Sequence, residues 1–131
     1  MVARDLDSPG PELLAFLTER HVGTLTTLRP DGTPHVVPVG FTYDPVTRLA
    51  RVITSGNSAK AHHVRAGHRR VAICQVDGRR WVTLEGAVTV RHAPEAVADA
   101  EHRYAQRYRR PRENPHRVVL EISVDRIMAH T

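Results

Sequence analysis

VAICQVDGRRWVTLEGAVTV, residues 71–90, contains two strand-forming runs on either side of one tight turn. The runs cover residues 71–76 and 81–90, and both are rich in the β-branched and aromatic residues that strands favour. Asp77-Gly78 between them is a dipeptide typical of hairpin turns. Gly86 interrupts the longer run, where a glycine often marks a bulge. The segment therefore predicts an antiparallel hairpin with a bulge in its second strand.

Four further runs on either side of this hairpin favour extended structure. They are residues 24–28, 34–43, 49–54 and a last run in which Val118, Leu120, Ile122 and Val124 share one face. The turn signal Arg29-Pro30-Asp31-Gly32 joins the first two into a hairpin. Because Pro38 cannot donate a ladder hydrogen bond, we expect its run to form an edge or bulged strand.

Three segments with helical periodicity separate the strands. They are residues 11–20, a short helix of about eight residues that ends at Gly67, and residues 94–108. Many short antiparallel strands in a small chain favour a closed or partly closed barrel, because closure removes exposed edges. We expect one mainly β (α+β) domain over residues 1–131, with six antiparallel strands and flanking helices. Side chains fill so small a barrel, so a cofactor should bind outside it, in a groove completed by a second subunit.

The charge balance is basic, with a formal net charge of +5 and a pI near 10.3. Lys60 is the single lysine beside 18 arginines, an imbalance that codon bias also produces, so we do not expect a nucleic-acid partner. No apolar run of about 18 residues and no signal-like N-terminus is present, which predicts a soluble cytoplasmic protein without a membrane segment. Cys74 lies in an apolar run and is predicted to be a small buried hydrophobe.

The chain contains no recognisable catalytic constellation. No serine lies in a nucleophile elbow, no carboxylates pair at a plausible spacing, and neither glycine-rich nucleotide motif is present. His62 and His63 are adjacent, so on a helix they point in different directions, unlike a metal-binding pair four residues apart. We therefore expect no metal site and leave the catalytic residue unassigned.

One segment combines hydroxyls, a glycine and a cation: Thr54-Ser55-Gly56-Asn57-Ser58-Ala59-Lys60. It runs from a predicted strand into a predicted helix, where unpaired N–H groups and the helix dipole favour an anion. The candidate ligands for a phosphate are Thr54, Ser55, Ser58 and Lys60. The alternative is that Asn57 or Ser58 is only a helix cap and Lys60 a solvated charge.

Two other features leave their roles open. Trp81, the single tryptophan, either stacks on a planar ring or fills a subunit interface. The basic stretch before the last strand either binds an acidic ligand or is a solvated loop. Its arginines are Arg107, Arg109, Arg110 and Arg112, with Arg117 at its end.

Short motifs follow one another along the chain in a distinctive order. They are GTLTTL at residues 23–28, DGTPHV at 31–36, RVIT at 51–54, Ser58-x-Lys60, DGxxW at 77–81 and LEG at 84–86. Their succession resembles the split β-barrel flavin-binding family related to pyridoxamine phosphate oxidase. VGFT at 39–42 and RYAQRY at 103–108 look like its small actinobacterial members that use the deazaflavin coenzyme F420, above all those that reduce biliverdin.

This resemblance implies a homodimeric split β-barrel with cofactor grooves at the subunit interface and the ring against the second and third strands. It implies that Lys60 is a phosphate ligand, with Ser55 and Ser58 nearby. It also implies three residues along the ring and one from the partner subunit: His35, Pro38, Val39, and Trp81 across the interface.

The chain departs from the family's FMN oxidases at Ala59, where an arginine usually stands beside the lysine. The arginine-containing C-terminal substrate motif of pyridoxamine phosphate oxidases is also absent. The resemblance therefore implies an F420H2-dependent reductase, with coenzyme F420 as cofactor and biliverdin or a related conjugated molecule as acceptor. The alternatives are an FMN-binding oxidase or reductase and a non-catalytic cofactor carrier. The arginines of residues 107–112 are available for the acceptor's propionates or for the cofactor's glutamyl tail.

Overall fold

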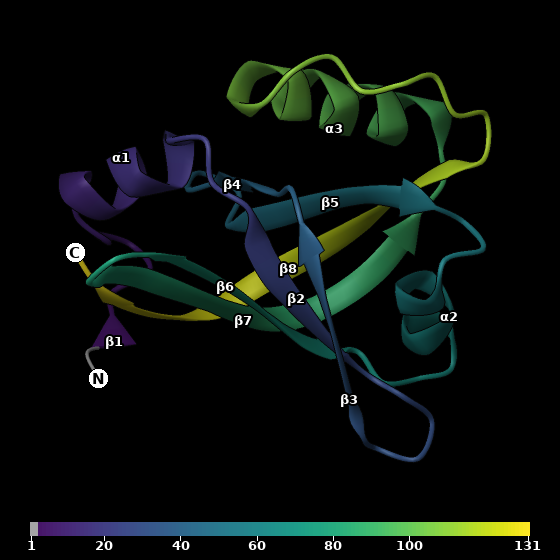
Figure 1. The fold of residues 1–131 in the computed structure, drawn as a ribbon, viewed down its shortest axis with the longest axis horizontal. Coiled ribbons are helices and arrows are strands. Elements are labelled where there is room, and N and C mark those ends of the chain that lie inside the picture. Colours follow the sequence, from purple (N-terminus) through teal and green to yellow (C-terminus); the bar gives the residue numbers. More distant parts are fainter. Residues whose placement is uncertain (1–2) are drawn as a thin grey trace.

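The computed structural model describes residues 3–131, which form eight strands and three helices (Figure 1). In chain order they are β1 (Ala3–Arg4), α1 (Pro11–Thr18), β2 (Gly23–Leu28), β3 (Pro34–Val39), β4 (Thr42–Asp44), β5 (Leu49–Ser55), α2 (Ala59–Arg65), β6 (Arg70–Asp77), β7 (Arg80–Arg91), α3 (Pro94–Arg107) and β8 (Arg117–His130). The strands pair antiparallel in the order β3-β2-β6-β7-β8-β5-β4, and β1 pairs with β8. This is the mainly antiparallel architecture with flanking helices that the sequence predicts.

The two edge strands of the sheet, β3 and β4, follow one another in the chain. Only Gly40 and Phe41 separate them, so the chain leaves one edge of the sheet and joins the other within two residues. Within the described residues, no ladder of hydrogen bonds joins β3 to β4, so the sheet does not close there. Only the chain itself connects the two edges, and the barrel is therefore split. Pro38 lies on edge strand β3, so its predicted edge position is confirmed.

The β6–β7 hairpin has the predicted features. Gly78 in its turn has φ +62°, the left-handed conformation that favours glycine. The register between β7 and β8 shifts between Glu85 and Gly86, which confirms a bulge at the predicted place. This shift lets the long strand curve around the barrel.

The prediction of six strands is wrong, because β1 and β4 are strands of their own. Residues 34–43 divide at Gly40-Phe41, since the fully buried Phe41 side chain turns into the core and the chain changes edges there. Ala3 and Arg4 become a strand through pairing with Met128 and Ile127 at the end of β8. The strand β1 thus depends on a partner that is distant in sequence, whereas β4 pairs with β5, the next strand along the chain.

Two helices close the core of the sheet. Helix α1 buries Leu13, Phe16 and Leu17 beneath it, and it ends at Thr18, two residues before the predicted end. Helix α2 buries Ala61 and Val64. None of the described helices has the length and apolar character needed to cross a bilayer.

Helix α3 runs alongside β5 (Figure 1) and is held mainly by polar contacts. Its buried residue is Ala100. Glu101 pairs with Arg117 of β8 at 2.6 Å, and Arg103 pairs with Asp44 of β4 at 3.5 Å. These ion pairs fix α3, and with it the basic loop that follows, over the split edge of the barrel.

The prediction that Cys74 is buried is wrong, because its side chain is partly exposed. Alternation along β6 turns Val71, Ile73 and Gln75 inward, so Cys74 lies on the opposite face. Gln75 is fully buried and donates to the Phe16 carbonyl at 3.0 Å. The apolar run therefore contains one polar residue of the core, and the cysteine is outside it.

Candidate functional site

A short turn carries the chain from the end of β5 into α2. The Ser58 backbone N–H donates to the Ser55 carbonyl (3.0 Å), and the Ser58 hydroxyl accepts from the Ala61 N–H (3.3 Å). Ser58 is therefore the N-cap of α2. This cap fixes the first turn of the helix, from which Lys60 projects.

Replacing Ser58 with alanine is expected to lower the free energy of unfolding by about 1 kcal/mol, the usual cost of losing a side-chain cap. Ser58→Thr keeps a hydroxyl at the cap and is the matched control. Urea denaturation followed by circular dichroism measures both variants. An alanine variant as stable as the wild type would show that this hydroxyl does not stabilise the helix.

A groove of about 640 Å³ opens beside Lys60, where β3 ends. Residues 38–40, Ile53 of β5 and Tyr104 of α3 contribute its less polar part. Cations contribute much of the rest: Lys60, Arg109, Arg110, Arg112 and Arg117. The groove thus joins the split edge of the sheet, the start of α2 and the loop after α3.

The electrostatics of this groove favour an anion. Among the described residues, its lining includes five cations and no carboxylate. Partial burial lowers the pKa of the Lys60 ammonium, because desolvation disfavours its charged form. No described carboxylate lies close enough to raise this pKa again. Arg117, by contrast, already pairs with Glu101. A partly desolvated ammonium gains most from a bound anion, so Lys60 is the strongest candidate anion ligand in the groove.

Six of the residues predicted from the sequence line the groove together: Pro38, Val39, Lys60, Arg109, Arg110 and Arg112. They come from β3, α2 and the loop after α3, which are distant in the chain. The structure therefore places the predicted phosphate ligand, part of the predicted ring contact and three of the predicted arginines in one hollow.

Thr54 and Ser55 support the groove without lining it. The Ser55 hydroxyl accepts a hydrogen bond from the Asn114 side-chain amide at 2.9 Å, which ties the basic loop to the end of β5. Thr54 pairs with Val118 in the ladder between β5 and β8. Both residues thus hold the segments that carry the groove cations.

His35 faces α2 instead of the groove. Alternation along β3 turns His35 and Pro38 to opposite faces. The rings of His35 and His63 meet nearly at right angles with 4.8 Å between centroids, and His63 Nδ1 lies 2.9 Å from the Thr27 hydroxyl. Desolvation and then the neighbouring His35 lower the pKa of His63. His35 therefore belongs to an edge-to-face ring contact between β3 and α2.

Arg107 points into the protein and attaches the end of α3 to the barrel. Its guanidinium donates to the carbonyls of Glu19 (2.8 Å) and Phe41 (2.7 Å) and to the side-chain oxygen of Gln75 (2.5 Å). Burial lowers the pKa of Arg107. With these donors engaged by the protein, Arg107 positions the basic loop and does not line the groove.

Trp81 lies at the far end of the sheet from Lys60. Trp81 pairs with His130 at the end of β8, whereas Ser55, close to α2, pairs with Arg117 at the start of β8. The length of β8 corresponds to roughly 40 Å of strand. Trp81 of one chain therefore lies outside that chain's own groove.

Sequence reasoning did not identify Gly40, Ile53 or Tyr104 as groove residues. The sequence does mark Gly40 as unusual, because a glycine interrupts the alternating run of residues 34–43. The chain passes from one edge of the sheet to the other at this point. Tyr104 projects from α3 on the side of the helix that borders the groove. Ile53 alternates with buried Val52, so it faces outward from the barrel.

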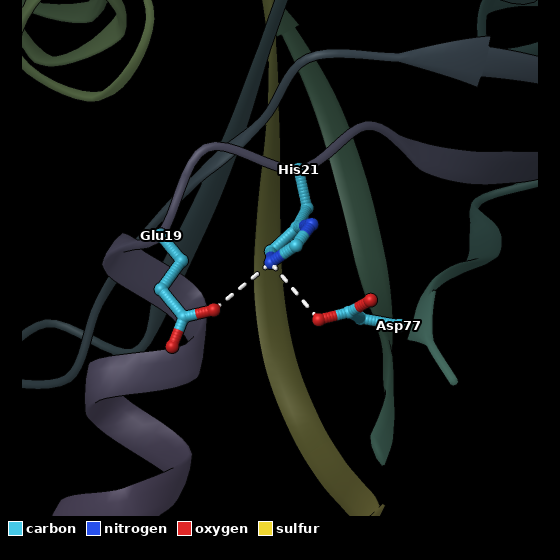
Figure 2. A group of neighbouring side chains, drawn as sticks. All are labelled: Glu19, His21 and Asp77. Atoms are coloured by element: carbon cyan, nitrogen blue, oxygen red, sulfur yellow. Dashed lines mark hydrogen bonds and ion pairs between the residues drawn. The ribbon is translucent and has the colours of Figure 1, made fainter. Parts of the chain in front are cut away.

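Outside the groove, Glu19, His21 and Asp77 lie close enough together to hold a metal ion (Figure 2). His21 Nε2 lies 3.0 Å from Glu19 and 3.8 Å from Asp77. Arg80 bonds both carboxylates, and its hydrogen bond is the main cause that lowers the pKa of Glu19 to about 2. Because a metal ion would have to displace this guanidinium, the cluster is an ion-pair network that joins the end of α1 to the β6–β7 turn.

The sequence profile of the pyridoxamine 5'-phosphate oxidase family matches residues 10–131. A protein of Mycobacterium tuberculosis (strain CDC 1551 / Oshkosh) named F420H(2)-dependent biliverdin reductase is 57% identical over 118 residues, which are 89% of this chain and 85% of that protein. A solved F420 reductase superposes with a TM-score of 0.72 at 25% identity and covers 92% of this chain and 98% of its own. A conserved hypothetical protein from Mycobacterium tuberculosis shares the fold, with a TM-score of 0.80 at 24% identity over 98% of this chain and 89% of its own.

Proposed function

The chain belongs to the pyridoxamine 5'-phosphate oxidase family, and we propose that it is an F420H2-dependent reductase that passes hydride to biliverdin or a related conjugated acceptor. The observation that carries this proposal is the high identity, along most of the chain, to the mycobacterial protein named for that activity. The cationic groove beside Lys60 supports it, because both the cofactor and the acceptor are anionic molecules with conjugated rings.

The groove fits the anionic parts of coenzyme F420. Lys60 is the residue that would hold the phosphate, since its ammonium is partly desolvated and has no described carboxylate beside it. Arg109, Arg110 and Arg112 suit either the glutamyl tail of the cofactor or the propionates of the acceptor. When bound, the reduced coenzyme supplies the hydride, so the chain's residues have to bind, orient and exclude water.

FMN is the alternative cofactor, because the family also includes FMN oxidases. Ala59, next to Lys60, argues against FMN, since an arginine usually stands there in those enzymes. Without that second cation the phosphate of FMN would have one charged ligand fewer. We therefore favour the deazaflavin.

We further propose that the reductase works in the cytoplasm as a homodimer, in which each chain supplies Trp81 to the groove of the other. Val76, directly opposite Trp81 in the β6–β7 ladder, is 61% exposed. Val22, just before the neighbouring strand β2, is equally exposed. Exposed apolar side chains beside a tryptophan support a subunit interface at this end of the sheet.

Fluorescence titration of the purified protein with oxidised coenzyme F420 tests the proposal. We expect saturable binding with a dissociation constant no weaker than on the order of tens of micromolar, and loss of biliverdin absorbance when F420H2 is supplied. A folded protein that binds no F420 in this range contradicts the proposal. A yellow protein that releases FMN supports the alternative, and binding without reduction of biliverdin or related acceptors supports a carrier. Sedimentation at the mass of two chains checks the dimer.

A further inference from the structure

We propose that Tyr104 is the ring-contact residue of the groove, with its aromatic face packed against the planar conjugated ring of the bound ligand. The inference rests on the proposed function, because it takes a deazaflavin or a biliverdin-like acceptor as the occupant. Tyr104 projects from α3, and it is the one aromatic side chain among the described residues that line the groove. Three observations support this role: its approach to β3, its fixed neighbour and the chemistry of the other lining residues.

Gly40 allows the Tyr104 ring to approach the end of β3. A Cβ added at Gly40 would lie 2.8 Å from Tyr104 Cε2 and 3.2 Å from Tyr108 Cε2. Carbon atoms repel one another at the shorter distance, so a larger residue at position 40 would displace the Tyr104 ring. The absence of a side chain at this position brings an aromatic face and residues 38–40 together in one wall of the groove.

Tyr108 fixes the ring of Tyr104. The two rings, one helical turn apart, have centroids 4.9 Å apart and planes tilted by 37°. The Tyr108 hydroxyl donates to the His21 carbonyl (2.6 Å) and accepts from the Phe41 N–H (3.1 Å). Because Tyr108 is hydrogen-bonded to two segments of the barrel, Tyr104 packs against a fixed neighbour. An aromatic wall that is already ordered loses little entropy when a ligand binds.

Among the described residues that one chain contributes to its own groove, Tyr104 alone offers an aromatic face to the ring of the ligand. Lys60 and the arginines can bind phosphate and carboxylate groups, but the faces of a conjugated ring gain most from apolar and aromatic contact. Pro38, Val39 and Ile53 supply aliphatic surface in the same groove. Tyr104 adds the aromatic face, and the groove thereby combines an anion site with a ring site.

Substitutions at Tyr104 separate the aromatic ring from side-chain bulk. We expect Tyr104→Phe to bind like the wild type, and Tyr104→Leu to weaken binding roughly 3- to 10-fold, the range for loss of one aromatic contact. Titration with oxidised coenzyme F420, followed by absorbance and fluorescence, gives its dissociation constant, and steady-state kinetics at saturating F420H2 give KM for biliverdin. Any shift of the bound cofactor's absorbance caused by stacking should persist with phenylalanine and shrink with leucine.

The two measurements identify which ring Tyr104 contacts. Weaker F420 binding alone assigns the cofactor ring to Tyr104, and a raised KM for biliverdin alone assigns the acceptor. A folded leucine variant with wild-type constants and spectra overturns the inference while the reductase activity stands. A wild-type protein that binds neither molecule overturns the proposed function and the inference together. If the leucine variant does not fold, Gly40→Ala provides the second test, with weaker binding expected and unchanged binding contradicting the inference.

Discussion

Alanine at Gly86 is expected to cost more than about 4 kcal/mol of the free energy of unfolding, a loss beyond that of most single substitutions. A Cβ at this position would lie 2.1 Å from the Ser123 carbonyl oxygen, 2.7 Å from its carbon and 3.0 Å from Val124 Cα. These are backbone atoms of β8, so no side-chain rotation relieves the overlap. Because β7 and β8 form the centre of the sheet, separating them disrupts the whole barrel.

Thermal and urea unfolding followed by circular dichroism measure this cost. Gly32→Ala is the control, because Gly32 has φ +85° and, apart from its chain neighbours, no atom of residues 3–131 lies within 4 Å of an added Cβ. It should lose only about 1 to 2 kcal/mol from left-handed strain. A Gly86→Ala protein that unfolds like the Gly32 variant would show that the bulge can open without disturbing the ladder.

Features specified by neighbours in the sequence could be predicted. Asp77-Gly78 marks its turn through the backbone conformation that a glycine permits, and the turn sets the pairing of β6 with β7. Gly86 marks the bulge because a glycine interrupts an otherwise regular strand. Pro38 marks the edge of the sheet because it lacks an N–H donor. In each case the physical cause is contained in one or two residues.

Features that depend on distant partners could not be predicted. The local sequence of Ala3–Arg4 carries no strand signal, and only its pairing with β8 makes it one. Residues 34–43 alternate like one strand, yet the burial of Phe41 bends the chain from one edge to the other. Cys74 lies in an apolar run, but its neighbours on either side face the core, so the cysteine does not.

In the candidate site, too, local features could be predicted and features that depend on distant partners could not. Its composition was predictable, because Lys60 stands out as the single lysine and the arginines cluster before the last strand. The directions in which the side chains point were harder to predict from the sequence. Arg107 and Arg109 are near neighbours in sequence, but Arg107 finds three acceptors inside the protein whereas Arg109 lines the groove. His35 was expected along the ring beside Pro38, but its ring packs against His63 of α2.

Lys60→Ala is expected to weaken binding of coenzyme F420 by roughly 1.5 to 3 kcal/mol, the range for losing a hydrogen bond to a charged group. The expectation follows from the partial burial of the ammonium in a groove to which the described residues contribute cations and no carboxylate. Arg69→Ala removes the same charge from an exposed position between α2 and β6 that does not line the groove, and it controls for the general effect of net charge. Fluorescence titration compares the dissociation constants. Equal weakening by both variants would mean that overall charge, and not contact with Lys60, attracts the cofactor.

The same lysine is expected to contribute nothing to the stability of the cofactor-free protein. Desolvation lowers its folded-state pKa below the ordinary value of 10.5, so the unfolded chain holds the proton more tightly. The resulting cost is present in full below the folded-state pKa and disappears as the pH rises above 10.5. Lys60→Met keeps the apolar stem without the charge, so near neutral pH it should melt at the same temperature as the wild type or higher, and any gain should vanish at alkaline pH. A methionine variant that melts at a lower temperature than the wild type would show that Lys60 stabilises the fold. If Lys60 serves to bind the ligand, the variant should bind the cofactor more weakly and remain as stable as the wild type.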